Sequence, residues 1–141
     1  MAQMIFVNLP IADIKRSRAF YGALGFTFDE RFSDDTTACV VVSDTIFFMI
    51  MERDRFAGFA PKPVADTQKT TSALIALSRD SRAAVDTITE AALANGGTDN
   101  KMVQEMGDYM YGRSFCDPDG NVIEVMWMDV EAAMKAWGGA A

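Results

Sequence analysis

The sequence predicts an α+β protein in which one βαβββ module occurs twice. Strand-like runs rich in β-branched and aromatic residues surround two amphipathic helical stretches. Each helical stretch starts near an aspartate that can cap it, stops at glycine, and is followed by three more strand-like runs. A chain of 141 residues that is 50% hydrophobic is long enough for one domain with a substantial core, so we expect a single domain over residues 1–141.

The first module is expected to span about residues 1–52. Ile, Phe and Val within residues 4–9 predict a strand, which Pro10 closes because proline lacks a backbone donor. Asp13 then caps a helix over residues 14–24, and Gly25 ends it. Three strands follow, over residues 26–32, 37–42 and 46–52.

The second module repeats this order over about residues 72–128, after an irregular connector at about 53–71 that contains Gly58, Pro61 and Pro63. A strand over 72–78 precedes a helix that Asp80 caps and the glycines at 96 and 97 end. Strands are predicted at 98–104, 109–116 and 121–127, the last two joined by the tight-turn sequence Asp-Pro-Asp-Gly. A short C-terminal helix is expected at about 129–137.

Composition excludes several function classes. The net charge of −7 opposes binding to nucleic acid and to anionic membrane surfaces, and no apolar run approaches the ~20 residues of a membrane span. The chain has no histidine, which removes the commonest general base and the commonest metal ligand. Two distant cysteines and the lack of a signal-peptide pattern lead us to expect free thiols and a cytoplasmic location.

Two stretches resemble the vicinal-oxygen-chelate (VOC) superfamily, which is the glyoxalase, bleomycin-resistance and dioxygenase family. Residues 7–26, VNLPIADIKRSRAFYGALGF, are similar to its opening strand and helix, and residues 112–125, GRSFCDPDGNVIEV, resemble its closing hairpin. The resemblance implies two βαβββ modules whose strands form a cup-shaped mixed sheet, within a homodimer, with a small molecule held in the cup. Metal-dependent relatives place metal ligands on the first and last strands of each module.

The sequence departs from this family at the metal positions. Phe6 and Leu74 stand where the first-strand ligands would be, and neither side chain binds metals. The position on the last strand of module 1 falls near Met49, with Glu52 further along, so Glu124 alone matches a family metal ligand. One carboxylate does not hold a divalent catalytic ion tightly, because such sites supply three or more protein ligands. We therefore expect no metal and no other cofactor, with a divalent metal ion as the alternative.

Counting across the Asp-Pro-Asp-Gly turn places Arg113 opposite Glu124 on one face of the sheet. Glu124 is then part of an ion pair, a polar anchor for the ligand, or a metal ligand. Strand alternation adds aromatic and methionine side chains to this face, although such residues also fill ordinary cores. The predicted ligand pocket consists of Phe6, Asn8, Phe48, Met49, Tyr109, Tyr111, Arg113, Phe115, Glu124 and Met126.

Three functions compete on these observations. The leading hypothesis is a homodimeric, glyoxalase/bleomycin-resistance-like protein that binds a small hydrophobic or aromatic compound in the cup without a metal. The alternative is an enzyme, either a metal-dependent lyase or isomerase similar to lactoylglutathione lyase, or a dioxygenase. The third is a subunit with an interaction role alone, which a filled and closed cup would favour.

Overall fold

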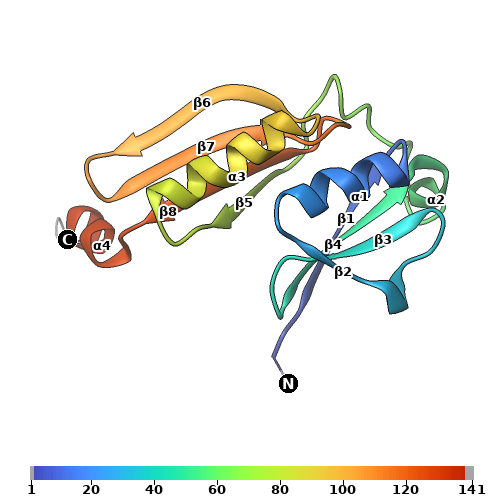
Figure 1. Ribbon diagram of the computed structural model, residues 1–141, viewed down its shortest axis with the longest axis horizontal. Helices are drawn as coiled ribbons and strands as arrows, with labels where there is room; N and C mark the ends of the chain where they lie inside the picture. Colours follow the sequence, from blue (N-terminus) through green and yellow to red (C-terminus); the bar gives the residue numbers. More distant parts are fainter. Residues whose placement is uncertain (1, 139–141) are drawn as a thin grey trace.

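The computed structural model describes residues 2–138 and contains the two expected βαβββ modules (Figure 1). Module 1 consists, in chain order, of β1 (Ile5–Ile11), α1 (Ile14–Ala23), β2 (Thr27–Asp29), the 3₁₀ turn η1 (Glu30–Phe32), β3 (Thr37–Val41) and β4 (Ile46–Glu52). The strands form a mixed four-stranded sheet in the order β1-β4-β3-β2, with β1 parallel to β4 and the other pairs antiparallel.

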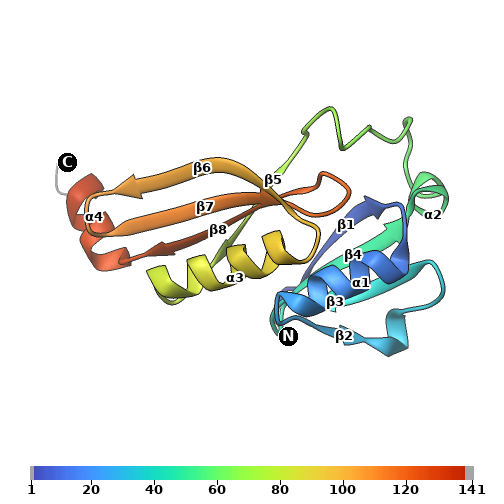
Figure 2. The ribbon, with the colours of Figure 1, turned by 45° about the horizontal axis from the view of Figure 1, so that its top comes forward.

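Module 2 repeats this topology with β5 (Leu74–Ser78), α3 (Arg82–Ala94), β6 (Thr98–Met106), β7 (Met110–Cys116) and β8 (Val122–Met128). Its sheet has the order β5-β8-β7-β6, again with one parallel pair, β5 and β8. The short helix α2 (Arg53–Ala57) begins the connector, which runs over the junction of the two modules to β5 (Figure 2). Helix α4 (Val130–Gly138) follows β8, and no helix within residues 2–138 is long and apolar enough to cross a membrane.

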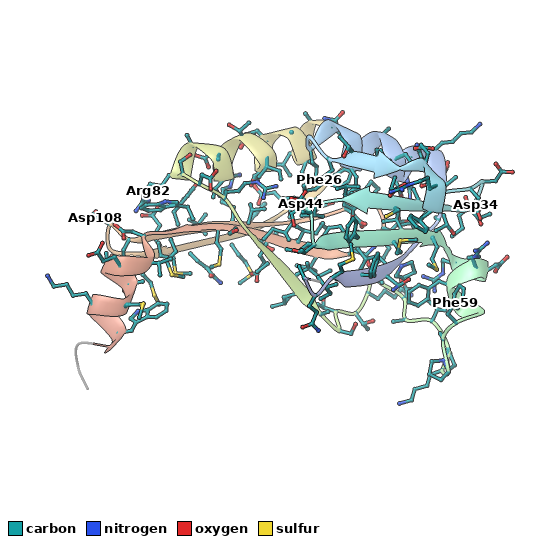
Figure 3. All side chains as sticks on the ribbon, turned by 90° about the horizontal axis from the view of Figure 1, so that it is seen from below. Phe26, Asp34, Asp44, Phe59, Arg82 and Asp108 are labelled. Atoms are coloured by element: carbon teal, nitrogen blue, oxygen red, sulfur yellow. The ribbon has the colours of Figure 1, made fainter. Side chains whose placement is uncertain are left out.

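The core lies between each sheet and its helix. Helices α1 and α3 cover the same side of the two sheets, and the other side carries no helix of that length within residues 2–138 (Figure 3). Buried side chains from both helices meet alternate residues of the central strands, and they form one hydrophobic cluster across the two modules. Its largest fully buried members are Tyr21, Phe20, Phe48 and Phe115.

Three local expectations are wrong. Strand β1 continues through Pro10 to Ile11, because β1 is an edge strand and an edge tolerates a residue without a backbone donor. The strand expected at 26–32 stops at Asp29, whose carboxylate accepts from the Arg31 backbone N–H at 3.1 Å and starts η1. The N-cap of α3 is Ser81 rather than Asp80, since the Ser81 hydroxyl accepts from the Ala84 N–H at 3.0 Å.

The Asp-Pro-Asp-Gly turn of module 2 is hydrogen-bonded to module 1. Buried Asp117 accepts the Tyr21 hydroxyl at 2.8 Å and the Asn121 amide at 2.9 Å through Oδ2, and two backbone N–H groups at 2.9 Å through Oδ1. Burial raises the pKa of the Asp117 carboxyl, although its hydrogen bonds to Asn121 and Tyr21 oppose that shift. Asp119 accepts from Arg16 at 2.7 Å and from the Ala12 N–H at 2.9 Å. The bonds from Tyr21, Arg16 and Ala12 to this turn fix the two modules to each other.

Gly120 completes the turn with φ of 89°, a left-handed conformation that favours glycine. A Cβ built on Gly120 would lie 2.2 Å from the carbonyl oxygen of Thr67 in the connector. The Thr67 hydroxyl also donates to the Asp119 carbonyl at 2.5 Å. The turn is therefore held between module 1 and the connector.

Candidate functional site

Each sheet has an open face, defined here as the side that α1 or α3 does not cover (Figure 3). Alternation along the strands assigns residues to it, because neighbours of buried core residues point the other way. In β4, Phe48 and Ile50 are buried among the core cluster, so Phe47 and Met49 belong to the open face. Both open faces are hollowed, and their chemistry differs.

The open face of module 1 carries an aromatic platform. The rings of Phe6 and Phe47 stack with centroids 4.9 Å apart and planes within 12°, and Phe6 remains 49% exposed. They line a hollow of about 540 Å³ whose other members include Asn8, Cys39 and Met49. An exposed, preformed stack of this kind suits the flat face of an aromatic or apolar molecule.

Two of the three charged groups that line this hollow pair with each other, while the third, Asp44, makes no ion pair among the described residues. Arg31 donates to both carboxylate oxygens of Asp29, at 3.0 and 2.8 Å, and its guanidinium also lies 5.6 Å from the ring centre of Phe32. The side-chain hydrogen bond from Arg31 lowers the pKa of Asp29. The hollow therefore presents chiefly apolar surface to a ligand.

The open face of module 2 is polar by comparison. Its hollow has a volume of about 590 Å³ and includes Asn100, Gln104, Ser114 and Glu124. Apolar side chains flank these groups, among them Leu74, Met102 and Val122. Met126 lies beside Glu124 in an adjoining crevice of the same face.

The predicted pairing of Arg113 with Glu124 is wrong by one residue. Glu124 stands opposite Ser114, and Arg113 stands opposite Val125. The loop is one residue longer than expected, since Cys116 pairs with Val122 and residues 117–121, rather than 117–120, form it. A shift of one residue moves every side chain of a strand to the other face.

The same shift explains why several predicted pocket residues lie on the helix side. Arg113 donates to Glu90 at 2.8 Å and to Asp86 at 3.2 Å on α3, and the Glu90 bond contributes most to raising the pKa of its guanidinium. The Tyr111 hydroxyl donates to Asp86 at 2.6 Å. Phe115 has no exposed surface, so it belongs to the core and does not line a pocket.

Two further predicted pocket residues also lie away from the hollows. Phe48 is fully buried against Tyr21, with ring centres 6.0 Å apart. Tyr109 lies outside the strands, at the turn before β7, and its hydroxyl accepts from the Trp137 ring nitrogen of α4 at 3.1 Å. The predicted residues that do lie on the open faces are Phe6, Asn8, Met49, Glu124 and Met126, and their role in binding stays a prediction.

The residues at the family's metal positions do not fit a metal ion. Phe6 and Leu74 offer no donor atom, and Met49 offers only a thioether. The Glu52 carboxylate accepts the Ile14 N–H at 3.1 Å and so caps α1. Within residues 2–138 no three of the acidic and cysteine side chains gather where they could hold a metal ion.

Four residues that line the hollows were not predicted from the sequence: Phe47, Asn100, Gln104 and Ser114. Phe47 is adjacent to the predicted Phe48, and only the strand register separates the two faces of a continuous apolar run. The one-residue error in the hairpin register assigned Ser114 to the opposite face of the sheet. Asn100 and Gln104 lie around an irregularity in β6. The signal for it is the pair Asp99-Asn100, since the Asp99 carboxylate accepts the Lys101 N–H at 2.7 Å as in an Asx turn.

Comparison with solved structures identifies the fold. A glyoxalase/bleomycin resistance protein/dioxygenase family enzyme from Burkholderia phytofirmans has 22% sequence identity and a TM-score of 0.71, over 89% of this chain and 98% of that chain. The fosfomycin resistance protein FosX of Listeria monocytogenes, solved with Mn(II) and sulfate, has 16% identity and a TM-score of 0.70, over 97% and 98%. Lactoylglutathione lyase of Agrobacterium tumefaciens has 16% identity and a TM-score of 0.64, over 89% and 93%. At these identities the likeness shows the fold, which is that of the VOC proteins.

A family model matches the first module more specifically. Residues 3–43 match the N-terminal domain described as bleomycin resistance protein-like. This match and the structural likeness confirm the resemblance to the glyoxalase, bleomycin-resistance and dioxygenase superfamily. A search of curated proteins found no match.

Proposed function

We propose that this chain is a cytoplasmic, small-molecule-binding protein that holds a hydrophobic or aromatic compound against its open faces without a metal ion. The stacked Phe6 and Phe47 carry the proposal, because the half-exposed Phe6 ring and the buried Phe47 ring beneath it form a preformed aromatic surface inside a hollow. Hollows of several hundred Å³ on both open faces favour binding over a role in interaction alone. The metal-dependent alternatives are disfavoured, since Glu124 is the one strong donor at the family's metal positions and the others hold Phe6, Leu74 and an apolar strand.

We also propose that the protein is a homodimer in which a second copy covers the open faces. Exposed apolar side chains are concentrated on these faces and on the adjoining edge strands β1, β5 and β6, for example Ile5, Leu74, Met102 and Val103. Exposed apolar side chains that gather in this way are typical of an interface. Analytical ultracentrifugation tests this part, with a protomer mass of 15.5 kDa as the reference.

The binding proposal is tested with N-phenyl-1-naphthylamine, a neutral aromatic probe that becomes fluorescent in apolar sites. Chelator-treated protein should bind it, and Phe6→Ala should weaken binding because half of the stack is lost. The expected loss is about 1 kcal/mol, or roughly fivefold in Kd. Met134→Ala, which removes an exposed apolar side chain from α4, is the matched control and should leave Kd unchanged. Equal binding by the Phe6→Ala protein and the unmodified protein would refute the assignment.

A further inference from the structure

The hollow on module 2 contains a carboxylate with no partner of its own. Within residues 2–138 the Glu124 side chain makes no hydrogen bond and no ion pair, although it is only partly exposed and lines the hollow beside Ser114 and Gln104. Carboxylates that are partly removed from water ordinarily find a donor or a cation. The absence of one here points to a partner that arrives with the ligand.

An irregularity in β6 shapes the hollow around this carboxylate. Asp99 pairs with Phe115 and the next pair is Val103 with Arg113, so three residues of β6 face one residue of β7. The middle one, Lys101, has φ of 58° and is the one non-glycine residue with positive φ among the described residues. Bulges of this kind redirect side chains at functional positions, and such strain persists only where the surroundings enforce it.

The bulge brings a polar row to the hollow. The Asn100 amide donates to the Ser114 hydroxyl at 2.8 Å and accepts from the Cys116 thiol at 3.3 Å. Because Ser114 accepts this bond, its own hydrogen remains available, and Ser114 stands directly opposite Glu124. The Gln104 amide makes no side-chain hydrogen bond within the described residues and lines the same crevice.

The charges around the hollow favour a cation. The guanidinium of Arg113 points to the carboxylates of α3 on the other side of the sheet. Lys69, at the rim, lies 4.0 Å from Asp66. Lys69 and Glu124 are the charged residues that line this hollow. Lys69 is 81% exposed at the rim beside Asp66, so Glu124 is the charge that has no counter-ion among the described residues, in a protein whose net charge is −7.

We propose that this hollow binds the protonated amine of an amine-bearing apolar or aromatic ligand, with Glu124 as its acceptor and Ser114 and Gln104 as neutral partners beside it. The cation then occupies the place where metal-dependent relatives of this fold would use the corresponding glutamate. This inference rests on the proposed function and deepens it, because the amine is the polar end of a ligand whose apolar body lies against Leu74, Met102 and Val122 in the same hollow.

The test compares 1-naphthylmethylamine with 1-naphthylmethanol, which have the same aromatic body with and without a cationic amine. Isothermal titration calorimetry at neutral pH should show that the unmodified protein binds the amine about tenfold more tightly than the alcohol. Glu124→Gln, which keeps the shape and removes the charge, should abolish this preference. Glu131→Gln removes the same charge from the first turn of α4, where Glu131 is exposed, and should retain the preference.

The outcomes separate the two proposals. If the alcohol binds in a Phe6-dependent way and the amine gains nothing, the proposed function stands and the assignment of Glu124 is wrong. If the amine preference depends on Glu124 but Phe6→Ala changes neither affinity, the amine site stands and the aromatic platform is wrong. If neither compound binds, or the preference survives in Glu124→Gln, the amine site is refuted.

Discussion

Removing the Tyr21 hydroxyl tests how the Asp-Pro-Asp-Gly turn holds the two modules together. Tyr21 is fully buried, and its hydroxyl donates to Asp117 at 2.8 Å. A hydrogen bond to a charged group contributes about 1.5–3 kcal/mol net. Asn121 still donates to the same oxygen in Tyr21→Phe, so we expect the low end, about 1.5 kcal/mol, or roughly a 1 M decrease in the urea midpoint.

Tyr111→Phe is the matched control, because Tyr111 donates to Asp86, whose side chain is 51% exposed and remains solvated. Its expected cost is about 0.5 kcal/mol. Asp117→Asn should cost more than either, about 3 kcal/mol, since an amide cannot accept four hydrogen bonds. Tyr21→Phe should cost little in the Asp117→Asn background. If the effects of the two substitutions on the free energy of unfolding add within about 0.5 kcal/mol, at fixed protomer concentration, this explanation of how the turn is held to module 1 is refuted.

Three further predictions follow from other positions. Gly120→Ala should lower the free energy of unfolding by at least about 2 kcal/mol, since backbone strain and a clash with the Thr67 carbonyl combine. Gly25→Ala, where φ is 97° and the space around the Cβ is open, should cost about 1 kcal/mol from strain alone. Urea unfolding measures both, and equal costs would contradict the clash. Arg113→Met should lower the free energy of unfolding by about 1 kcal/mol and leave the Kd of N-phenyl-1-naphthylamine unchanged. A higher Kd would show that Arg113 contributes to the ligand site. Burial raises the pKa of the Cys39 and Cys116 thiols. Iodoacetamide should therefore react with them more slowly in the native protein than in urea, and the pH dependence of the rate should shift to higher pH. Equal rates in the two states would contradict the burial of these thiols.

The order of elements could be predicted because each boundary has a local chemical cause. Asp13 caps α1 as expected and accepts the backbone N–H groups of Lys15 and Arg16 at 3.0 and 3.3 Å. Gly25 follows that helix with a positive φ, as expected from its sequence. β4 begins with its apolar run at Ile46 and ends at Glu52, one residue after that run.

The side-chain directions could be predicted only in part, because they depend on register. In the run from Phe47 to Met51 both faces of the strand carry apolar side chains, so the pattern does not distinguish Phe47 on the open face from Phe48 in the core. The hairpin loop is one residue longer than expected, and this places Arg113 on the helix side instead of the expected open face. The bulge at Lys101 has no glycine to mark it.

The most direct test of the central claim, that the open faces hold an organic ligand without a metal, is the melting temperature of chelator-treated protein. The protein is measured alone, with N-phenyl-1-naphthylamine, and with Zn²⁺, Ni²⁺, Mn²⁺ or Fe²⁺. A ligand at 100 times its Kd stabilises the native state by about 2.7 kcal/mol, which raises the melting temperature of a chain of this size by roughly 5–10 °C. We predict such a rise with the aromatic probe and none with the ions. A comparable rise with one of the ions that Glu124→Gln abolishes would contradict the metal-free site and favour a metal-dependent enzyme.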